Sequence, residues 1–399
     1  MKNVAALDTG PSGDQLLVEG LLTAAGREDP HSVLRGTGQL GCRYSSAREI
    51  LHSANFLPAL VSPSEFELFR MFARWMISLD GERHRAMRRA FGGLFGPRTI
   101  DRYREPIQST ANELLEVVVE RGQMDLVGDF ARPLPLQIIC NVLGVPAADV
   151  SWVERQMITL GQGFANQREA EFLHAASDAA TELQAYFAEL LEARQRSPVD
   201  DVLTELVRQL PADAETRADA VANCVLFVIA GHATTTSLIA AGTLFLLENG
   251  ELPTIDQIPD AVEELLRLIT PTSIVVTRAS EALEIEGCPI AAGQHRFVFL
   301  AAANRDPEVF VDPDRLDLRR DPNPHLAFSA GEHYCLGAPL ARLHGEIAIS
   351  TLFRRLPGLR LDGKPEWRGS FPLRELERLP VAWHRGRSGR PSGDPAARL

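Results

Sequence analysis

The chain has 399 residues, enough for two or three average domains or for one large enzyme with a single core. Its composition, 45% hydrophobic and 24% charged, is typical of a soluble globular protein, and a formal net charge of −12 argues against nucleic-acid binding. The five cysteines are far apart and form no C-x-x-C pair, so we expect neither a zinc site nor a disulfide framework, and a cytoplasmic location. The first residues lack an apolar stretch long enough for a signal or anchor.

The first two thirds of the chain are predicted to be mainly helical. Residues 31–46 alternate and carry glycines, which indicates a short hairpin. Apolar residues then recur with the spacing of helices that bury one face. That pattern predicts helices over residues 80–95, 101–122, 129–142, 148–165, 168–194, 213–248 and 258–269.

The last third mixes short strands with one more helix. Strands are predicted at 273–277, 282–288 and 294–300, and four prolines between residues 304 and 327 exclude long regular structure. A helix over 338–356 follows, and then β-like segments to about residue 384. We expect one mainly α-helical domain with small β-sheets over residues 1–386, followed by a disordered tail over 387–399.

The apolar stretch from Val221 to Leu247 is nearly long enough to span a membrane. Its middle carries Gly-His-Ala-Thr-Thr-Thr-Ser, and such polar groups are costly when they face lipid. Acidic residues just upstream suit the first turns of a soluble helix. We therefore predict a long helix through the protein core and no membrane attachment.

A single cysteine stands just before a predicted helix, in the segment Phe328-Ser-Ala-Gly-Glu-His-Tyr-Cys-Leu-Gly337. A sulfur there lies near free backbone N–H groups and the positive end of the helix dipole, which we expect to lower the thiol pKa. The flanking glycines let the backbone approach a bulky flat group, and Phe328 can cover one side of it. A thiolate presented in this way suits axial ligation of haem iron. An ordinary buried cysteine is the alternative.

This segment resembles the cysteine-ligand loop of the cytochrome P450 family, the haem-thiolate monooxygenases, in which Phe, Gly, His, Cys and Gly recur at these spacings. The family usually has glycine where Ser329 stands. The order of elements is similar to the family fold over nearly the whole chain, which implies one cytochrome P450 catalytic domain with a long central helix over the haem. The resemblance implies haem b (iron protoporphyrin IX), with Cys335 as the metal ligand.

The resemblance also implies partners for the anionic haem propionates. His84 and Arg88 are four apart on one predicted helix, Arg278 and His333 match further propionate contacts of the family, and His325 is a weaker candidate. The expected cofactor-binding residues are His84, Arg88, Arg278, Phe328, His333, Cys335 and Gly337.

Glu264 and Arg267 are three apart on a predicted helix and therefore share a face. The resemblance makes them the helix pair of a structural triad whose third member is Arg315, and the triad holds the cysteine loop in place. A plain surface ion pair, which is worth little, is the alternative.

The segment Ala230-Gly231-His232-Ala233-Thr234 resembles the oxygen-binding kink of the family's central helix. Gly231 is expected to leave room for oxygen, and Thr234 to hydrogen-bond to the carbonyl of Ala230. We predict Ala230, Gly231, His232 and Thr234 as catalytic-site residues, although glycine and threonine can also just relieve crowding between helices. The family usually has Asp or Glu at position 233, where it helps relay protons. Ala233 cannot do so, and His232 points roughly 100° away around the helix.

The substrate pocket is expected to be hydrophobic. Its predicted lining comprises Leu226, Ile229, Ile274, Val276, Phe371 to Leu373, and the aromatic residues Phe56, Phe66, Phe69 and Trp75 of the 56–75 segment. Some of these aromatic residues are expected to belong to the ordinary core instead.

The resemblance implies an O2-dependent monooxygenase that hydroxylates a hydrophobic small molecule with electrons from a ferredoxin-type partner and its reductase. A role in specialised-metabolite biosynthesis follows from fold-level analogy. Arg89 and Arg342 are candidate residues for docking an acidic ferredoxin. Ala233 leaves open a non-hydroxylating reaction such as oxidative coupling, nitration or nitric-oxide reduction. A haem-based gas sensor without turnover and a carrier-tethered substrate are further alternatives.

Overall fold

The computed structural model describes residues 43–385 except 60–63, 168, 211–212, 251 and 369–374. The described residues are mainly helical with small antiparallel sheets, as the sequence predicts. Most of the predicted hairpin at 31–46 lies outside the described residues, and its last part is wrong, because helix α4 occupies Tyr44–His52. Phe371 and the tail over 387–399 also lie outside them.

The helices include every predicted one in the predicted order, with small shifts at their ends, together with several short helices that were not predicted. They are α5 (Glu67–Phe72), α6 (Gly81–Gly92), α7 (Pro97–Val118), α8 (Pro133–Val142), α9 (Val150–Ala165), α10 (Ala170–Arg196), α11 (Val202–Gln209), α12 (Ala214–Asn249), α13 (Ile258–Ile269), α14 (Leu300–Ala303) and α15 (Ala338–Arg355). Helices α4, α5, α11 and α14 were not among the predicted ones, although Asp201 caps α11 by accepting a hydrogen bond from the Thr204 N–H at 2.9 Å. A π-helical turn at Val127–Ala131 precedes α8, so the predicted helix over 129–142 is two elements.

Four small sheets accompany the helices. One has the order β1 (Phe56–Pro58), β3 (Val275–Ala279), β6 (His295–Val298), and a second has the order β2 (Gln123–Asp125), β10 (Pro380–Ala382), β7 (Arg360–Leu361). Two further two-stranded sheets pair β4 (Leu283–Ile285) with β5 (Cys288–Ile290), and β8 (Glu366–Arg368) with β9 (Glu375–Arg378). The single strand predicted at 282–288 is wrong, because Glu286 and Gly287 have φ of 48° and 79° and form the turn between β4 and β5.

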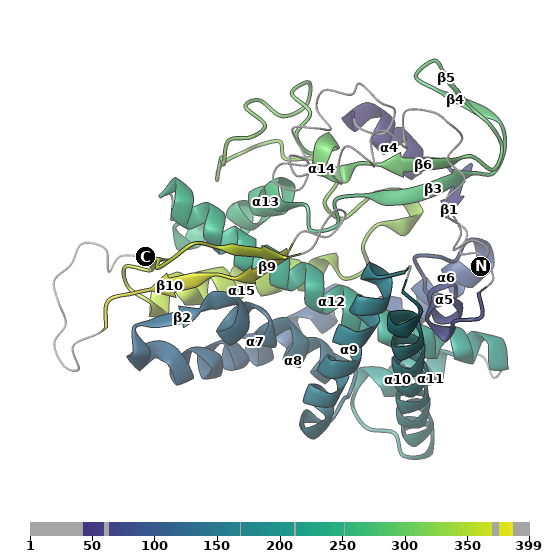
Figure 1. Cartoon of the computed structure of the whole chain (residues 1–399), viewed down its shortest axis with the longest axis horizontal. Coiled ribbons are helices and arrows are strands. Elements are labelled where there is room, and N and C mark those ends of the chain that lie inside the picture. The colour runs from purple at the N-terminus through teal and green to yellow at the C-terminus, as the bar shows by residue number, and fades with distance from the viewer. Residues whose placement is uncertain are drawn as a thin grey trace.

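Helix α12 runs through the middle of the molecule, with the sheet of β1, β3 and β6 on one side and helices α7 to α11 on the other (Figure 1). Among the described residues, α12 alone is long and apolar enough to cross a membrane, and 56% of its most apolar window is buried inside the fold. That burial favours the predicted core helix. The packing of α8 and α15 against α12 brings the cysteine loop and the middle of α12 to one cavity.

Candidate functional site

A cavity of about 1390 Å³ is lined by the cysteine loop, by the middle of α12 and by the start of β3. Cys335, Phe328 and His333 contribute the loop side of the wall, and Gly231 and Thr234 contribute the α12 side. The structure therefore brings the predicted thiol ligand and the predicted oxygen-site residues to the same space, although they are about a hundred positions apart in the sequence.

One backbone hydrogen bond closes the cysteine loop on itself. The Cys335 N–H donates to the carbonyl of Phe328 at 2.9 Å, and α15 begins at Ala338. Desolvation by the surrounding protein raises the pKa of the Cys335 thiol, although its side chain is open to the cavity, while the N–H groups of Gly337 and Ala338 and two arginines lower it. The expected lowering is therefore wrong for the metal-free thiol, because desolvation outweighs the helix start. A bound metal cation would reverse this balance, since a coordinating thiol is deprotonated.

Two of the glycines, Gly331 and Gly231, act differently from the prediction. Gly331 has φ of 69°, and a Cβ there would collide with the backbone carbonyl of Leu51 in α4. Gly331 is therefore needed for contact with α4. A Cβ at Gly231 would point at Ile139 of α8, 3.0 Å from its Cγ1, so this glycine allows α8 and α12 to approach closely. Gly337 faces open space instead, because a Cβ at this position would meet no packed neighbour within 4 Å.

A cluster of basic side chains lies at one edge of the cavity. The His84 and His333 rings lie 4.2 Å apart between centroids, and Arg88 Nη1 donates to the Tyr334 carbonyl at 2.8 Å. Burial lowers the pKa of His84, and burial together with His84 lowers the pKa of His333 to about 4. His84 Nε2 is buried and has no hydrogen-bond partner among the residues that the structure describes. Arg278 on β3 does not line the cavity, but its Nε is likewise buried without a partner.

These observations fit a flat anionic cofactor bound through a thiolate. The buried nitrogens of His84 and Arg278 lack acceptors, which carboxylate groups would supply. The space in front of Gly337 leaves room beside Cys335, and Phe328 lies on the same wall.

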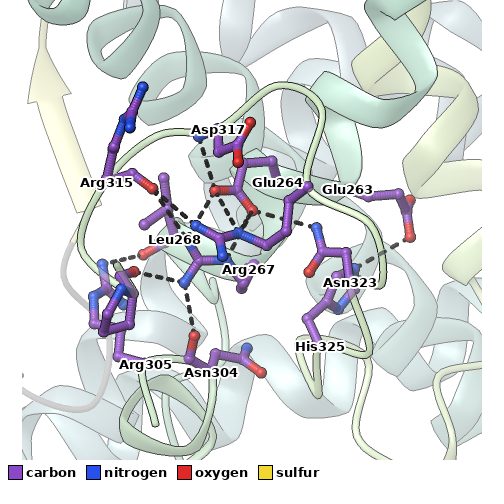
Figure 2. A network of polar contacts seen from close by, with 12 residues as sticks. Glu263, Glu264, Arg267, Leu268, Asn304, Arg305, Arg315, Asp317, Asn323 and His325 are labelled. Carbon is purple, nitrogen blue, oxygen red and sulfur yellow. Dashed lines mark hydrogen bonds and ion pairs between the residues drawn. The ribbon is translucent and has the colours of Figure 1, made fainter. Parts of the chain in front are cut away.

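The predicted triad is correct in its helix pair and wrong in its third member. Glu264 and Arg267 are fully buried, and Arg267 Nε and Nη2 donate to the Glu264 carboxylate at 2.8 Å. Arg320 supplies the third side chain, with Nε 3.1 Å from both Glu264 oxygens. Arg315 contributes only its carbonyl, which accepts from Arg267 Nη2 at 3.3 Å. Figure 2 shows the Arg315 guanidinium turned away from Glu264.

The same network anchors the proline-rich segment that precedes the cysteine loop. Arg267 Nη1 donates to the carbonyls of Asn304 at 2.8 Å and Pro313 at 2.7 Å. The Asn304 side-chain oxygen in turn accepts from the Leu326 N–H at 2.6 Å, two positions before Phe328. One buried guanidinium therefore fixes the path of the chain from α14 to the cysteine loop (Figure 2).

A second ionic contact clamps the loop from α15. Arg342 Nε and Nη2 donate to the Glu263 carboxylate at 2.7 and 2.8 Å, and the guanidinium carbon lies 4.6 Å from the Phe328 ring centroid. His325 Nε2 lies 3.2 Å from the same carboxylate, so His325 is not a propionate partner. Burial tends to raise the pKa of Glu263, but His325 and Arg342 together lower it to about 2. Arg342 is therefore committed to the loop rather than free for docking.

The middle of α12 has part of the predicted geometry. Thr234 Oγ1 donates to the Ala230 carbonyl at 2.6 Å, and both residues line the cavity, but the helix continues unbroken through this point. His232 does not line the cavity, and burial lowers its pKa to about 4. It therefore faces away from the predicted oxygen site, and Ala233 leaves that part of α12 without an acid.

The predicted pocket residues divide into three groups. Leu226, Ile274, Val276, Phe66 and Phe69 line the cavity. Ile229, Phe56 and Trp75 do not, because they pack into the core instead. Phe371 belongs to the residues outside the described part of the chain.

Further lining residues were not predicted from the sequence, among them Glu65, Phe72, Met76, Ile77, Phe95, Ile139, Phe164, Phe227, Leu238 and His344. Helical spacing carried a signal for some of them, since Phe69 and Phe72 are three apart on α5.

Comparison with known proteins places the chain in a family. A family model described as Cytochrome P450 matches residues 250–357. The biotin biosynthesis cytochrome P450 of Bacillus subtilis (strain 168) is 37% identical over 362 residues, which cover 88% of this chain and 92% of that protein. Pentalenic acid synthase of Streptomyces avermitilis is 34% identical, with 89% of each chain covered. The crystal structure of P450BioI in complex with hexadec-9Z-enoic acid ligated acyl carrier protein has a TM-score of 0.86 at 34% identity, covering 90% of this chain and 100% of that one.

The chain belongs to the cytochrome P450 family. It is an oxidoreductase of the monooxygenase type, and family membership implies a haem cofactor, a small-molecule substrate and a redox partner. Relatives named for biotin, polyketide and pentalenic acid synthesis support a role in specialised metabolism.

Proposed function

We propose that this protein is a cytoplasmic haem b monooxygenase that hydroxylates a hydrophobic small molecule. The observation that carries the proposal is the shared cavity, which has Cys335 on one wall and Thr234 among apolar side chains on another. Cys335 is the thiolate ligand in this proposal, and His84, Arg88, Arg278 and His333 bind the propionates. When bound, haem supplies the dioxygen chemistry, which thiolate donation promotes.

The rest of the cavity wall selects and orients the substrate. Phe69 and Phe72 both make edge contacts with the Phe164 ring, at 6.4 and 5.7 Å between centroids, and Phe66 lines the same cavity. Aliphatic side chains from α12 and β3 complete the wall. A cavity of about 1390 Å³ exceeds the usual size for a drug-sized ligand, so it leaves room for a large hydrophobic substrate beside the cofactor.

Thr234 is the proposed oxygen-site residue. Its hydroxyl hydrogen is already donated to the Ala230 carbonyl, so its oxygen lone pairs remain available to accept a hydrogen bond from water in the cavity. Ala233 supplies no acid at this point. That absence is the specific observation that favours a second candidate, a non-hydroxylating haem-thiolate reaction such as oxidative coupling, nitration or nitric-oxide reduction.

A carrier-tethered substrate is a further option within the same proposal. It is supported by the solved relative whose fatty acyl group is attached to an acyl carrier protein. A free and a tethered form of one acyl chain would distinguish the two cases, because only a tethered substrate gains affinity from docking of the carrier.

Electrons are proposed to come from an acidic ferredoxin that docks beside α6. Arg85 and Arg89 on this helix have half or more of their side-chain surface exposed, at 53% and 65%, and both pair with the more exposed Glu82. Exposed pairs of this kind exchange partners easily. Arg89→Glu should slow ferredoxin-driven reduction and weaken its salt dependence, and an unchanged salt dependence would contradict docking at this helix.

The central experiment is a spectral titration of the holoenzyme against a metabolite library, followed by mass analysis of the products formed with a surrogate ferredoxin and reductase. Hydroxylation predicts a gain of one oxygen atom, whereas oxidative coupling predicts loss of hydrogen with no added oxygen. A pyridine haemochrome spectrum tests for haem b. Cys335→Ser should abolish the thiolate-type Soret band of the ferrous carbonyl complex together with turnover, and retention of both would overturn the proposal.

A further inference from the structure

A buried histidine that the proposed chemistry does not use lines the cavity. His344 on α15 is 2% exposed, and its Nδ1 lies 3.1 Å from the carbonyl oxygen of Leu340. Because a carbonyl only accepts, Nδ1 carries the proton and donates it. Nε2 is then a bare acceptor, and it is buried without a hydrogen-bond partner in the described part of the chain. Burial lowers the pKa of His344 to about 4, so the ring is neutral near pH 7.

A second polar group of the cavity wall, the Thr235 hydroxyl, lies on α12. Thr235 on α12 lines the cavity and is 4% exposed, and it forms no hydrogen bond to any other residue within the described part of the chain. Thr235 and Leu238 are three apart and share a face of α12. A Cβ at Gly345 would lie 3.0 Å from Leu238 Cδ2, so α12 and α15 cross at this point. Thr235 precedes Leu238 by three positions and His344 adjoins Gly345, so both lie near this crossing and line the same cavity.

We propose that His344 Nε2 and the Thr235 hydroxyl hold an ordered water at the crossing of α12 and α15, and that this water supplies protons to the Thr234 end of the cavity. A buried water needs two to four polar partners, and these two atoms provide an acceptor and a hydroxyl that can donate or accept. Such a water would give both polar groups the hydrogen-bond partner that buried polar groups normally have.

The inference rests on the proposed oxygen insertion, which consumes O2, two electrons and two protons and forms one water for each hydroxyl group made. The redox partner supplies the electrons, but position 233 carries no acid to pass the protons. In our proposal the bound water releases a proton toward Thr234 and regains one from other water in the cavity. His344 stays neutral and orients the water, so it is a positioning residue.

A crystal structure of the haem-loaded enzyme at a resolution that shows ordered water tests the site directly. We expect a water within hydrogen-bond distance of both His344 Nε2 and Thr235 Oγ1, and its disappearance in the His344→Leu variant. A dry crossing, with no ordered water near Nε2, would overturn the proposal. This measurement needs no substrate, so its failure is distinct from a failure of the proposed hydroxylation.

Three variants and a matched control test the proton supply. His344→Leu removes the acceptor, Thr235→Val removes the hydroxyl at nearly constant shape, and His344→Gln keeps an acceptor. The control is Thr236→Val, because the Thr236 hydroxyl is also buried and unpartnered but does not line the cavity. All four should retain the thiolate-type carbonyl spectrum.

The readout is the fraction of electrons recovered in product from the library compound that binds most tightly. We expect His344→Leu and Thr235→Val to lower this fraction about fivefold, as loss of one hydrogen bond to the water implies, with hydrogen peroxide released instead. His344→Gln should recover part of the loss. Product formation driven by added hydrogen peroxide, which brings its own protons and electrons, should not change. Unchanged coupling, or an equal loss with added peroxide, would refute a role in proton supply.

Discussion

Replacement of Arg320 by alanine tests the revised triad most sharply. The Arg320 side chain is 8% exposed, its Nε lies 3.1 Å from both Glu264 oxygens, and its Nη1 donates to the Val311 carbonyl at 2.7 Å. Removal of one partner from a buried ion pair costs about 3–5 kcal/mol. Because Glu264 keeps Arg267, the Asp317 N–H and the Asn323 amide as partners, we place the loss near the lower end, at about 3 kcal/mol.

Arg315→Ala is the matched control, because Arg315 is exposed and uses only its backbone carbonyl, which alanine retains. Its cost should stay within about 0.5 kcal/mol. Arg320→Lys should fall between the two, since an ammonium group keeps the charge but not the fork of donors. The assay is a urea titration of the holoenzyme that follows far-UV circular dichroism together with the thiolate-type carbonyl band. Equal losses for Arg315→Ala and Arg320→Ala would refute the assignment.

Further predictions concern the cysteine loop. Gly331→Ala should lower the free energy of unfolding by about 2 kcal/mol or more and weaken haem retention, because the φ of 69° and the Leu51 carbonyl both oppose a Cβ at this position. Thermal melts and haem titration measure the two effects. Gly337→Ala should leave the stability of the apoprotein unchanged and lower only its affinity for haem, because the added methyl group would enter open space. A loss of apoprotein stability equal to that of Gly331→Ala would contradict this. Ser329→Gly should stabilise the protein by roughly 0.5–1 kcal/mol, because Ser329 has φ of 60°, and a lower melting temperature would count against it. The pKa of Glu263 is lowered from 4.5 to about 2, so its carboxylate stabilises the folded protein fully above about pH 4.5, and this stabilisation is lost as the pH falls toward 2. Glu263→Gln should therefore make the free energy of unfolding depend less on pH between these two values, as measured by urea titrations across that range.

Much of the fold could be predicted from local pattern. Helices that bury one face or their whole length repeat apolar residues at helical spacing, and this repeat is visible in the sequence without knowledge of the elements that pack against them. This holds for α6, α9, α10, α12, α13 and α15. The strand predicted at 282–288 failed because Glu286 takes a positive φ that sequence pattern does not announce. Helix α11 is only eight residues long, so its pattern repeats barely twice.

The site was predictable in its chemistry and less so in its contacts. A motif with fixed spacing located Cys335 and its loop, because the loop must present one thiol to one cavity. The choice between Arg315 and Arg320 depends on how a segment with four prolines folds back on α13, and no periodicity records that path. The position of His344 could not be predicted for the same reason, because only the crossing of two helices places this residue on the cavity wall.

Most of the contacts that hold the loop around Cys335 come from outside the loop itself. Gly331 is held against α4, Arg267 fixes the path of the chain that leads into the loop, and Arg342 lies over Phe328 while bound to Glu263. These supports come from three separate helices, so small movements of any one of them need not displace the sulfur. A metal ligand must be held close to its productive geometry by surroundings that are themselves packed. The distant residues Glu264 and Arg320 therefore belong to the same functional unit as the thiol, and loss of Arg320 should appear first in the carbonyl band and only later in the helical signal.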